Sequence, residues 1–212
     1  MKEKHLIGFI GCRKTVAVSL VAAALACLLS ASPLPAQFVV RPVNLAYLSR
    51  RADLIIQGVV TSVKNKPLPG YPNIPTVEVT LSVERSLRGL PGKTYTFREV
   101  YLGLRSQQGK LAYSTGQRLF LFLLSPSQYG LSSPIGIGQG RFHIASDASG
   151  NAKLANEQWN AGLFHDVERD VVKAGKQLTP SEHKLTSTSR GPVPLEEFVS
   201  LVKSLTTLPR IK

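Results

Sequence analysis

The chain has 212 residues, of which 43% are apolar and 18% are charged, and 26 lysines and arginines stand against 13 acidic residues. This composition excludes an intrinsically disordered or collagen-like chain, and the length predicts one main domain with appendages rather than two full-sized enzyme domains. The formal net charge of +13 predicts attraction to anionic partners, without distinguishing nucleic acid, envelope polymers and lipid headgroups.

The first segment has the features of a secretory signal peptide. Basic side chains in residues 1–14 precede an uncharged apolar stretch over residues 15–31, and Pro33 and Pro35 then break any helix. We expect cleavage between Ala36 and Gln37, and therefore export to the periplasm or the cell exterior, with no transmembrane segment left in the mature protein.

Two other readings of this segment remain open. The uncharged stretch is at the short limit for a retained membrane anchor, and Cys27 is the position at which a lipoprotein would carry its lipid. Cleavage at Ala36 removes four basic residues and one acidic residue, which leaves a net charge of +10. It also removes Cys12 and Cys27, so the mature protein would contain neither a disulfide nor a cysteine-based catalytic or metal site.

The mature chain is expected to begin with a short helix that leads into a strand. Apolar residues recur at helical spacing in residues 41–52, with Asn44 as the N-cap. Residues 54–66 are rich in β-branched side chains and predict a strand with a bulge at Gly58. The prolines and the glycine of residues 66–75 argue against regular structure and predict a protruding loop.

The following segments predict further antiparallel strands. Residues 76–84 alternate strictly, with Val77, Val79, Leu81 and Val83 facing inward and Thr76, Glu78, Thr80 and Ser82 facing water. Residues 119–124 form an apolar run that is typical of a strand buried on both faces. The other predicted strands are residues 93–102, with Tyr95, Phe97 and Glu99 on one side, residues 135–145, which contain three glycines, and residues 152–155.

The last third of the chain changes character. Residues 160–176 carry a helical stripe, residues 178–191 are rich in serine and threonine and predict a loose segment, and residues 195–205 predict an amphipathic helix that docks on the strands. The stripe consists of Leu163, Phe164, Val167 and Val171, and the apolar face of the last helix of Leu195, Phe198, Val199, Val202 and Leu205.

Five or six strands without a helix long enough for a parallel crossover predict an all-antiparallel barrel or sandwich. The fragments RADLIIQGVV (residues 51–60), VERSLRG (83–89), GQRLFLFL (116–123) and GQGRF (138–142) resemble a group of uncharacterised exported bacterial proteins. That group in turn looks like the OB-type barrel of the netrin and tissue-inhibitor-of-metalloproteinase modules. In those inhibitors an N-terminal cysteine meets the protease zinc, and the expected mature chain has no cysteine, so the resemblance implies the barrel and not protease inhibition.

The resemblance covers about residues 52–145 and completes the expected organisation. Residues 1–36 are a cleaved signal peptide, and residues 37–156 form an antiparallel, five- to six-stranded OB-like barrel with a leading helix. Residues 157–212 form a helical extension with a C-terminal amphipathic helix.

The patterns that would indicate catalysis or a cofactor are weak. Residues 136–140 (GIGQG) are not followed by a helix, so glycine bulges in a strand explain them better than a phosphate-binding loop. His143, His165 and His183 are isolated from one another, which is untypical of a metal site. The acids of residues 166–170 interleave with Arg169 and Lys173 and predict ion pairs on a wet helix. We expect neither an enzyme nor a bound metal or cofactor.

A ligand-binding face is the functional feature that the sequence favours. OB barrels bind single-stranded nucleic acid and oligosaccharides through basic and aromatic side chains. For an exported protein we expect an envelope polymer rather than nucleic acid as the ligand. The candidate ligand-binding residues, all within the expected barrel, are Arg98, Tyr101, Arg105, Tyr113, Arg118 and Arg141.

Three functions therefore stand as hypotheses. The first is an exported, non-enzymatic binding or interaction module for an anionic envelope ligand. The second is an inhibitor or accessory subunit of an envelope enzyme, with the loop between Pro67 and Pro75 as a wedge. The third is a hydrolase with an unrecognised site, which would be favoured by a pocket that joins His165 and Asp166 to a serine.

Overall fold

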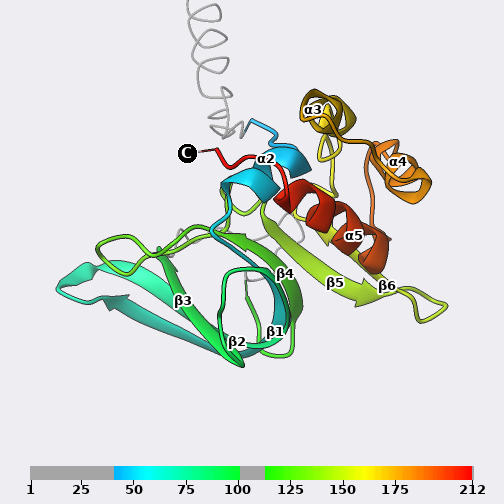
Figure 1. The fold of residues 1–212 in the computed structure, drawn as a ribbon. Coiled ribbons are helices and arrows are strands. Elements are labelled where there is room, and N and C mark those ends of the chain that lie inside the picture. Colours follow the sequence, from blue (N-terminus) through cyan, green and yellow to red (C-terminus); the bar gives the residue numbers. More distant parts are fainter. Residues whose placement is uncertain (1–40, 101–112, 212) are drawn as a thin grey trace, which may run out of the picture. The chain divides into compact units, whose positions relative to one another are not determined.

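Seven antiparallel strands form one sheet with the spatial order β3-β2-β1-β4-β5-β6-β7 (Figure 1). The computed structural model describes residues 41–100 and 113–211. In chain order the elements are α2 (Leu45–Arg51), β1 (Leu54–Leu68), β2 (Tyr71–Arg88), β3 (Thr94–Val100), β4 (Arg118–Leu123), β5 (Arg141–Ser146), β6 (Ala152–Asn156), α3 (Val167–Lys173), α4 (Pro180–Thr186), β7 (Val193–Pro194) and α5 (Leu195–Thr206).

The prediction of a mainly β, antiparallel fold with a leading helix and a C-terminal amphipathic helix is confirmed. The sheet has seven strands rather than five or six because Val193–Pro194 pairs with β6 as a two-residue edge strand. The other edge is β3, and within residues 41–100 and 113–211 no strand pairs β3 with β5 or β7. The sheet is therefore open in this part of the chain.

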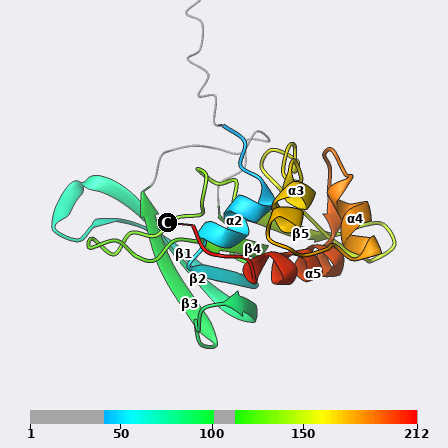
Figure 2. The same cartoon turned by 45° about the horizontal axis from the view of Figure 1, so that its top comes forward.

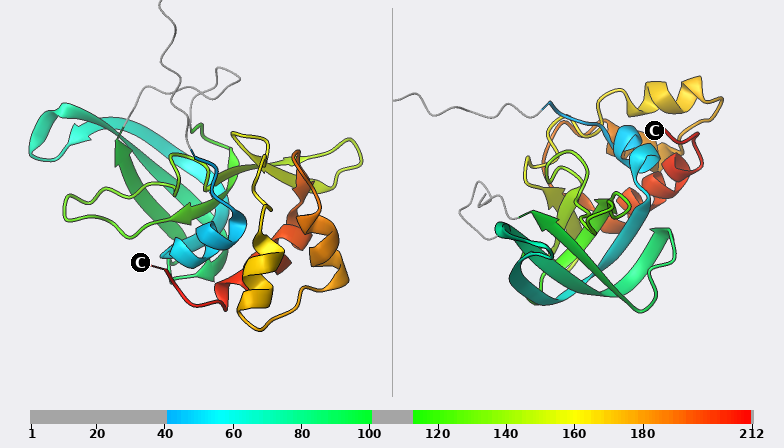
Figure 3. Two further views of the ribbon diagram at one scale, coloured as in Figure 1. Left: turned by 90° about the horizontal axis from the view of Figure 1, so that it is seen from above. Right: turned by 90° about the vertical axis from the view of Figure 1, so that its left-hand side faces the viewer.

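The prediction of an irregular loop over residues 66–75 is wrong, because β1 and β2 continue through this segment as a two-stranded hairpin. Pro67 pairs with Pro75, and Gly70 makes the turn with a φ of 80°. In this segment β1 and β2 pair only with each other among the described residues. The outer edge of each strand carries no neighbouring strand that would need a hydrogen bond from a proline, which has no N–H group. The hairpin projects away from the helices (Figures 1 and 3).

The predicted irregularity at Gly58 is confirmed by a shift in the β1–β2 register between Gln57 and Gly58. A Cβ atom on Gly58 would lie 2.4 Å from the carbonyl oxygen of Ser82, which is closer than any side chain tolerates. The glycine therefore allows β1 and β2 to approach each other where the sheet bends.

The predicted alternation in β2 is confirmed at its centre and differs at its ends. Val77, Val79 and Leu81 are buried, whereas Val83, next to the register shift, is only half-buried. Thr76 is buried rather than facing water, and its hydroxyl donates a hydrogen bond of 2.6 Å to the carbonyl oxygen of Lys66.

Strand β4 supplies side chains to both apolar clusters of the molecule, as predicted for a strand buried on both faces. Phe120 and Phe122 belong to the cluster on the helix side of the sheet. Leu119, Leu121 and Leu123 belong to the other cluster, around which β1, β2 and β3 curve (Figure 3).

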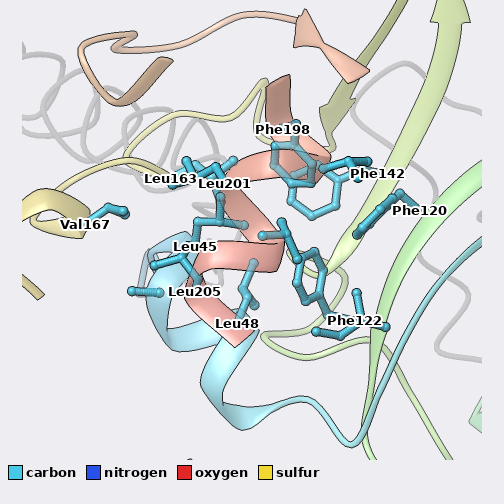
Figure 4. Packing of buried hydrophobic residues seen from close by; sticks show 14 of the residues in the cluster. Leu45, Leu48, Phe120, Phe122, Phe142, Leu163, Val167, Phe198, Leu201 and Leu205 are labelled. Carbon is cyan, nitrogen blue, oxygen red and sulfur yellow. The ribbon is translucent and has the colours of Figure 1, made fainter. Parts of the chain in front are cut away.

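The helices lie together on one side of the sheet (Figure 2). The predicted docking of the C-terminal helix is confirmed, because all the predicted apolar residues of α5 are buried. The Phe198 ring lies 5.1 Å from the Phe142 ring and 5.4 Å from the Phe120 ring, measured between centroids (Figure 4). These aromatic contacts add to the apolar area that α5 buries.

The helix predicted for residues 160–176 is shorter than expected. Only α3 is helical, because Trp159, Asn160 and Asp166 adopt left-handed backbone conformations that interrupt a longer helix. Asn160 is fully buried, and its side-chain amide donates to the carbonyl oxygens of Leu154 and Gly191. The four apolar residues of the predicted stripe are nevertheless buried, since the turns place them against the same cluster.

The loose segment predicted for residues 178–191 contains the helix α4. Thr179 and Glu182 cap its first turn reciprocally, and Ser204 of α5 donates a hydrogen bond of 2.7 Å to the Glu182 carboxylate. The hydroxyl groups of Thr179, Thr186 and Ser187 thus serve the two ends of α4, through its N-terminal cap and through bonds to its last carbonyl oxygens. Within residues 41–100 and 113–211 no helix has the length and apolarity to cross a bilayer.

Candidate ligand-binding cleft

A cleft of about 580 Å³ lies between the C-terminal end of β3, the helix α2 and the connection from β4 to β5. Three charged side chains line it, Arg51, Glu99 and Arg141. The rest of its lining is largely apolar and consists of Tyr47, Val77, Val100, Leu124, Leu131, Pro134, Ile135, Ile137 and two glycines, with three serines. A volume in this range is typical of small-molecule sites.

The outer wall of the cleft consists of turns where the sequence predicts a strand. Residues 135–140 are not extended, and β5 begins only at Arg141, so the prediction of one strand over residues 135–145 is wrong in its first half. Gly136, Ile137 and Gly138 have φ values of 70°, 53° and 87°. A β-branched residue rarely adopts this conformation, and the Ile137 side chain is 65% exposed beside the cleft.

Backbone hydrogen bonds fix this connection to the sheet. The Ser132 amide donates to the carbonyl oxygen of Arg98 on the edge strand β3 (2.7 Å), and the Ile135 amide donates to that of Phe122 on β4 (3.0 Å). A Cβ atom on Gly140 would lie 3.1 Å from the same Phe122 oxygen, a tighter contact than most side chains make, so glycine favours this close approach. The connection thus crosses the gap between β3 and β5, and the cleft lies beneath it.

The base of the cleft carries a buried guanidinium between two carboxylates. Arg141 Nη1 lies 3.9 Å from Glu99, and Nη2 donates a hydrogen bond of 3.3 Å to Glu157. His143 Nε2 lies 3.0 Å from the same Glu157 oxygen. Arg141 is 8% exposed, and its Nε has no hydrogen-bond partner among the residues that the structure describes.

Tyr113 lies behind this group, with its ring 4.8 Å from the guanidinium carbon of Arg141 and packed edge-on against Phe97. A cation above an aromatic face gains electrostatic stabilisation. Burial, and then the charge of Glu99, raise the pKa of Tyr113, so the phenol stays neutral. Burial opposes the charge of Arg141, whereas the charges of Glu157 and Glu99 favour it, and the pKa of Arg141 is raised.

The two carboxylates of this group differ in their electrostatics. Burial raises the pKa of Glu99 above its ordinary value, and the charge of Arg141 only partly offsets this. The hydrogen bond with His143 outweighs burial at Glu157 and lowers its pKa. Glu99, which lines the cleft, is therefore the carboxylate that takes up a proton more readily.

The structure does not bring the sequence-predicted site residues onto one surface. Arg98 is paired with Glu78 at 2.5 Å, and Arg118 with Glu84 at 2.8 Å, so both cations are locally neutralised. Tyr101 and Arg105 lie outside the described residues.

Two of the predicted residues do meet, in the interior. Tyr113, expected on the surface, is only 3% exposed, which corrects that expectation, and it stacks under Arg141. Arg141 and His143 lie on the same face of β5 and share Glu157 as a partner. The inward position of Glu99 in the alternation of β3 was the signal for its role, whereas Arg51 and Glu157 stand in no pattern that marks them.

A second hollow of about 570 Å³ bears on the hydrolase alternative, because His165, Asp166 and Ser187 line it together with His183. His165 Nδ1 lies 3.1 Å from Asp166, and the histidine side chain is 78% exposed. The Ser187 hydroxyl donates to the carbonyl oxygen of Lys184 at 2.7 Å. Within the described part of the chain, neither histidine bonds to the Ser187 hydroxyl, as an activating base would.

The predicted ion pairs of residues 166–170 are present in part. Arg169 contacts Asp166 at 2.7 Å, and Asp170 accepts a hydrogen bond of 3.3 Å from Asn44, the N-cap of α2. In residues 41–100 and 113–211, no three His, Cys, Asp or Glu side chains come together as metal ligands.

Comparison with known proteins gave no match to a protein-family model, to a curated protein or to a solved structure. The geometry of the cleft is therefore the basis for a functional conclusion.

Proposed function

We propose that the chain is an exported, non-enzymatic binding module whose ligand occupies the cleft between β3 and the β4–β5 connection. One observation carries the proposal: the Arg141 side chain is only 8% exposed, yet it lines a largely apolar cleft together with Arg51 and Glu99. Burying a cation costs desolvation free energy, and a ligand that places an anionic or acceptor group in the same cleft offsets that cost.

The fold gains little from this polar base. Replacing a buried ion pair by apolar side chains of similar volume is often neutral or stabilising, so the group of Arg141, Glu99 and Glu157 needs a reason other than stability. Recognition of a ligand is such a reason. The exposed side chains of Tyr47, Val100 and Ile137 add apolar surface at the mouth of the cleft.

The proposal includes export and an OB-like barrel. The apolar segment before Ala36 supports export, and the net charge of +10 after cleavage there supports an anionic envelope ligand. The strand order β3-β2-β1-β4-β5 supports an OB-like barrel, in which β3 and β5 would be the strands that approach each other at closure. The Ser132–Arg98 hydrogen bond and the Arg141–Glu99 pair link these two sides.

The test is recovery of a ligand from the envelope. The exported protein is incubated with an envelope extract, washed and examined by native mass spectrometry. Ser133→Trp fills the cleft from an exposed position, and Ser149→Trp adds the same side chain to an exposed turn elsewhere. We expect a bound ligand on the wild type and on Ser149→Trp but not on Ser133→Trp. Equal occupancy of the two variants, or an empty wild-type protein, would contradict the proposal. Intact mass of the same material tests a start at Gln37.

A specific observation also favours the second function, an accessory subunit or inhibitor that acts through the β1–β2 hairpin. Tyr71 at the hairpin tip is 46% exposed, and its ring packs edge-on at 5.7 Å against Tyr129 of the β4–β5 connection. Ile74 is also exposed. Tyr71→Ser with Ile74→Ser should then abolish inhibition or capture of one envelope enzyme while leaving the unfolding temperature and the cleft ligand unchanged.

A further inference from the structure

We infer that the cleft binds a carboxylate attached to an apolar body, with the carboxylate at Arg51 and Arg141 and the body along the apolar wall. This inference rests on the proposed function and names the chemical class of its ligand. It does not depend on the charge of the whole surface, because it concerns only the side chains that line the cleft.

The charges inside the cleft favour a monoanion. Two cations, Arg51 and Arg141, line it together with one carboxylate, Glu99. Glu157 offsets part of the charge of Arg141 but does not line the cleft, and its carboxylate is engaged by His143 at 3.0 Å. Arg51 lies in the last turn of α2 and contributes a second cation to the lining of the cleft. A guanidinium binds a carboxylate with charge-assisted hydrogen bonds and matches its geometry.

The lining selects the rest of the ligand. Val77, Leu124, Leu131 and Ile135 also line the cleft, and each methylene group of a ligand that leaves water for such an apolar surface strengthens binding. A short hydrophilic acid such as acetate would leave this surface unoccupied. A carboxylic acid with a chain of several methylene groups covers it.

Glu99 gives the site a dependence on pH. A ligand carboxylate at Arg141 approaches Glu99, whose own carboxylate lies 3.9 Å from Nη1, and two carboxylates at this range do not both stay ionised at low cost. Glu99 therefore takes a proton from solvent as the ligand binds, in the direction that its raised pKa already favours.

The groups that face Glu99 all bear on this titration. They are Arg141 of β5, Tyr113 behind it, and Arg51 and Tyr47 of α2 across the cleft, while Val77 of β2 is apolar. The charge of Arg141 favours the ionised form of Glu99 in the empty cleft, and the ligand carboxylate competes with Glu99 for this cation. Binding should thus tighten as the pH falls toward the range in which Glu99 is protonated.

A ligand with an uncharged amide in place of the carboxylate requires the opposite protonation state of Glu99. Its carbonyl would accept from Arg141 and its N–H would donate to the Glu99 carboxylate, so binding would require Glu99 to stay ionised and would weaken as the pH falls. The direction of the pH dependence therefore separates the two ligand chemistries.

The experiment is calorimetric titration of the exported protein with decanoate and with decanamide, at about pH 5.5 and about pH 7.5, in buffers of different ionisation enthalpy to count protons. We expect decanoate to bind with proton uptake, roughly tenfold more tightly at the lower pH, and decanamide to bind more weakly. Ser133→Trp should abolish binding of both.

Three variants sharpen the result. Arg51→Gln should weaken decanoate roughly tenfold, whereas Arg50→Gln, on the same helix but not in the cleft, should not. Glu99→Gln removes the titrating carboxyl and should bind decanoate at about pH 7.5 at least as tightly as the wild type, without proton uptake.

Several results would overturn the carboxylate assignment: decanamide as tight as decanoate, no effect of Arg51→Gln, proton uptake that persists in Glu99→Gln, or decanoate that binds Ser133→Trp unchanged. If these occur while Ser133→Trp still loses the envelope ligand, the proposed binding function stands and only the ligand class fails. If Ser133→Trp keeps the envelope ligand, the proposed function fails.

Discussion

The two faces of the sheet are built differently, although β4 contributes to both. On the helix side, Phe120 and Phe122 meet Phe142 and Phe198, and the described helices cover them (Figure 4). On the other side the leucines of β4 face the curved strands β1 to β3, and the apolar cluster ends at the Glu99–Arg141 pair.

The helix-covered face therefore serves mainly stability, and the curved face carries the groups that we propose for recognition. The helix-covered cluster contributes burial of apolar surface and close packing, and the buried Asn160 and Glu182 side chains beside it are hydrogen-bonded within the fold. The curved side places a cation, a carboxylate and a phenol beside its apolar core, where they cost desolvation free energy. Substitutions on the two sides should therefore differ in size and in what they affect.

The largest effect should come from a charge in the centre of the curved side. Val79 is fully buried, so Val79→Asp places an unpaired carboxylate in the core and should cost about 4 kcal/mol or more of unfolding free energy. Its neighbour Thr80 points to the other face of β2, and Thr80→Asp should cost less than about 1 kcal/mol. Urea unfolding followed by circular dichroism measures both. Similar losses would show that the register of β2 is wrong.

A truncation on the helix side should come next. Phe198 is fully buried among three phenylalanine rings, and Phe198→Ala should cost about 3 to 5 kcal/mol because it leaves a cavity. Val172→Ala on α3, where the side chain is 60% exposed, is the control and should be nearly neutral. A loss below about 1 kcal/mol for Phe198→Ala would contradict the docking of α5.

A single arginine joins the helices to the strands. Arg88 donates to the carbonyl oxygens of Ser49 and Ala52 at the end of α2, and to that of Thr206 at the end of α5. Arg88→Met removes the arginine donor from the carbonyls of Ser49 and Thr206, leaves Ala52 only its weaker bond from Arg210, and should cost about 2 to 3 kcal/mol. Arg85→Met removes only an exposed ion pair with Glu196 and should cost about 1 kcal/mol or less. Equal losses of stability in Arg88→Met and Arg85→Met, measured by thermal unfolding, would show that Arg88 does not join the helices to the strands.

Periodicity was sufficient to predict the elements whose side chains alternate or recur regularly. The inward valines of β2, the two-faced β4 and the apolar face of α5 follow from patterns of two or 3.6 residues. The bulge at Gly58 was predictable because a lone glycine in a β-branched run marks a close approach.

The rest depended on contacts that local pattern does not encode. The proline-rich hairpin is regular because its two strands pair with each other and have no further strand on their outer edges in the described part of the chain. The left-handed turn at Asn160 depends on a long-range hydrogen bond, and that at Ile137 on the path of the β4–β5 connection. In sequence, Arg141 stands out only as one of several basic residues within the expected barrel. Only the register of β5 and the crossing of that connection bring it beside Glu99.

The smallest expected effect compares the two carboxylates around Arg141 as the pH changes. The pKa of Glu99 is higher in the folded state than in the unfolded chain, so its contribution to stability is fully present below the unfolded pKa and is lost as the pH rises through the folded pKa. The pKa of Glu157 is lower in the folded state, so its contribution is present above the unfolded pKa and is lost as the pH falls through the folded value. Glu99→Gln should therefore gain unfolding free energy relative to the wild type as the pH rises toward neutrality, and Glu157→Gln should lose it over the same interval. Urea unfolding of both variants and the wild type between about pH 3 and about pH 8 measures the two differences. Curves that run parallel to the wild type would show that neither carboxylate titrates differently on folding, and the contrast between a helix side built for stability and a curved side built for recognition would lose its electrostatic basis.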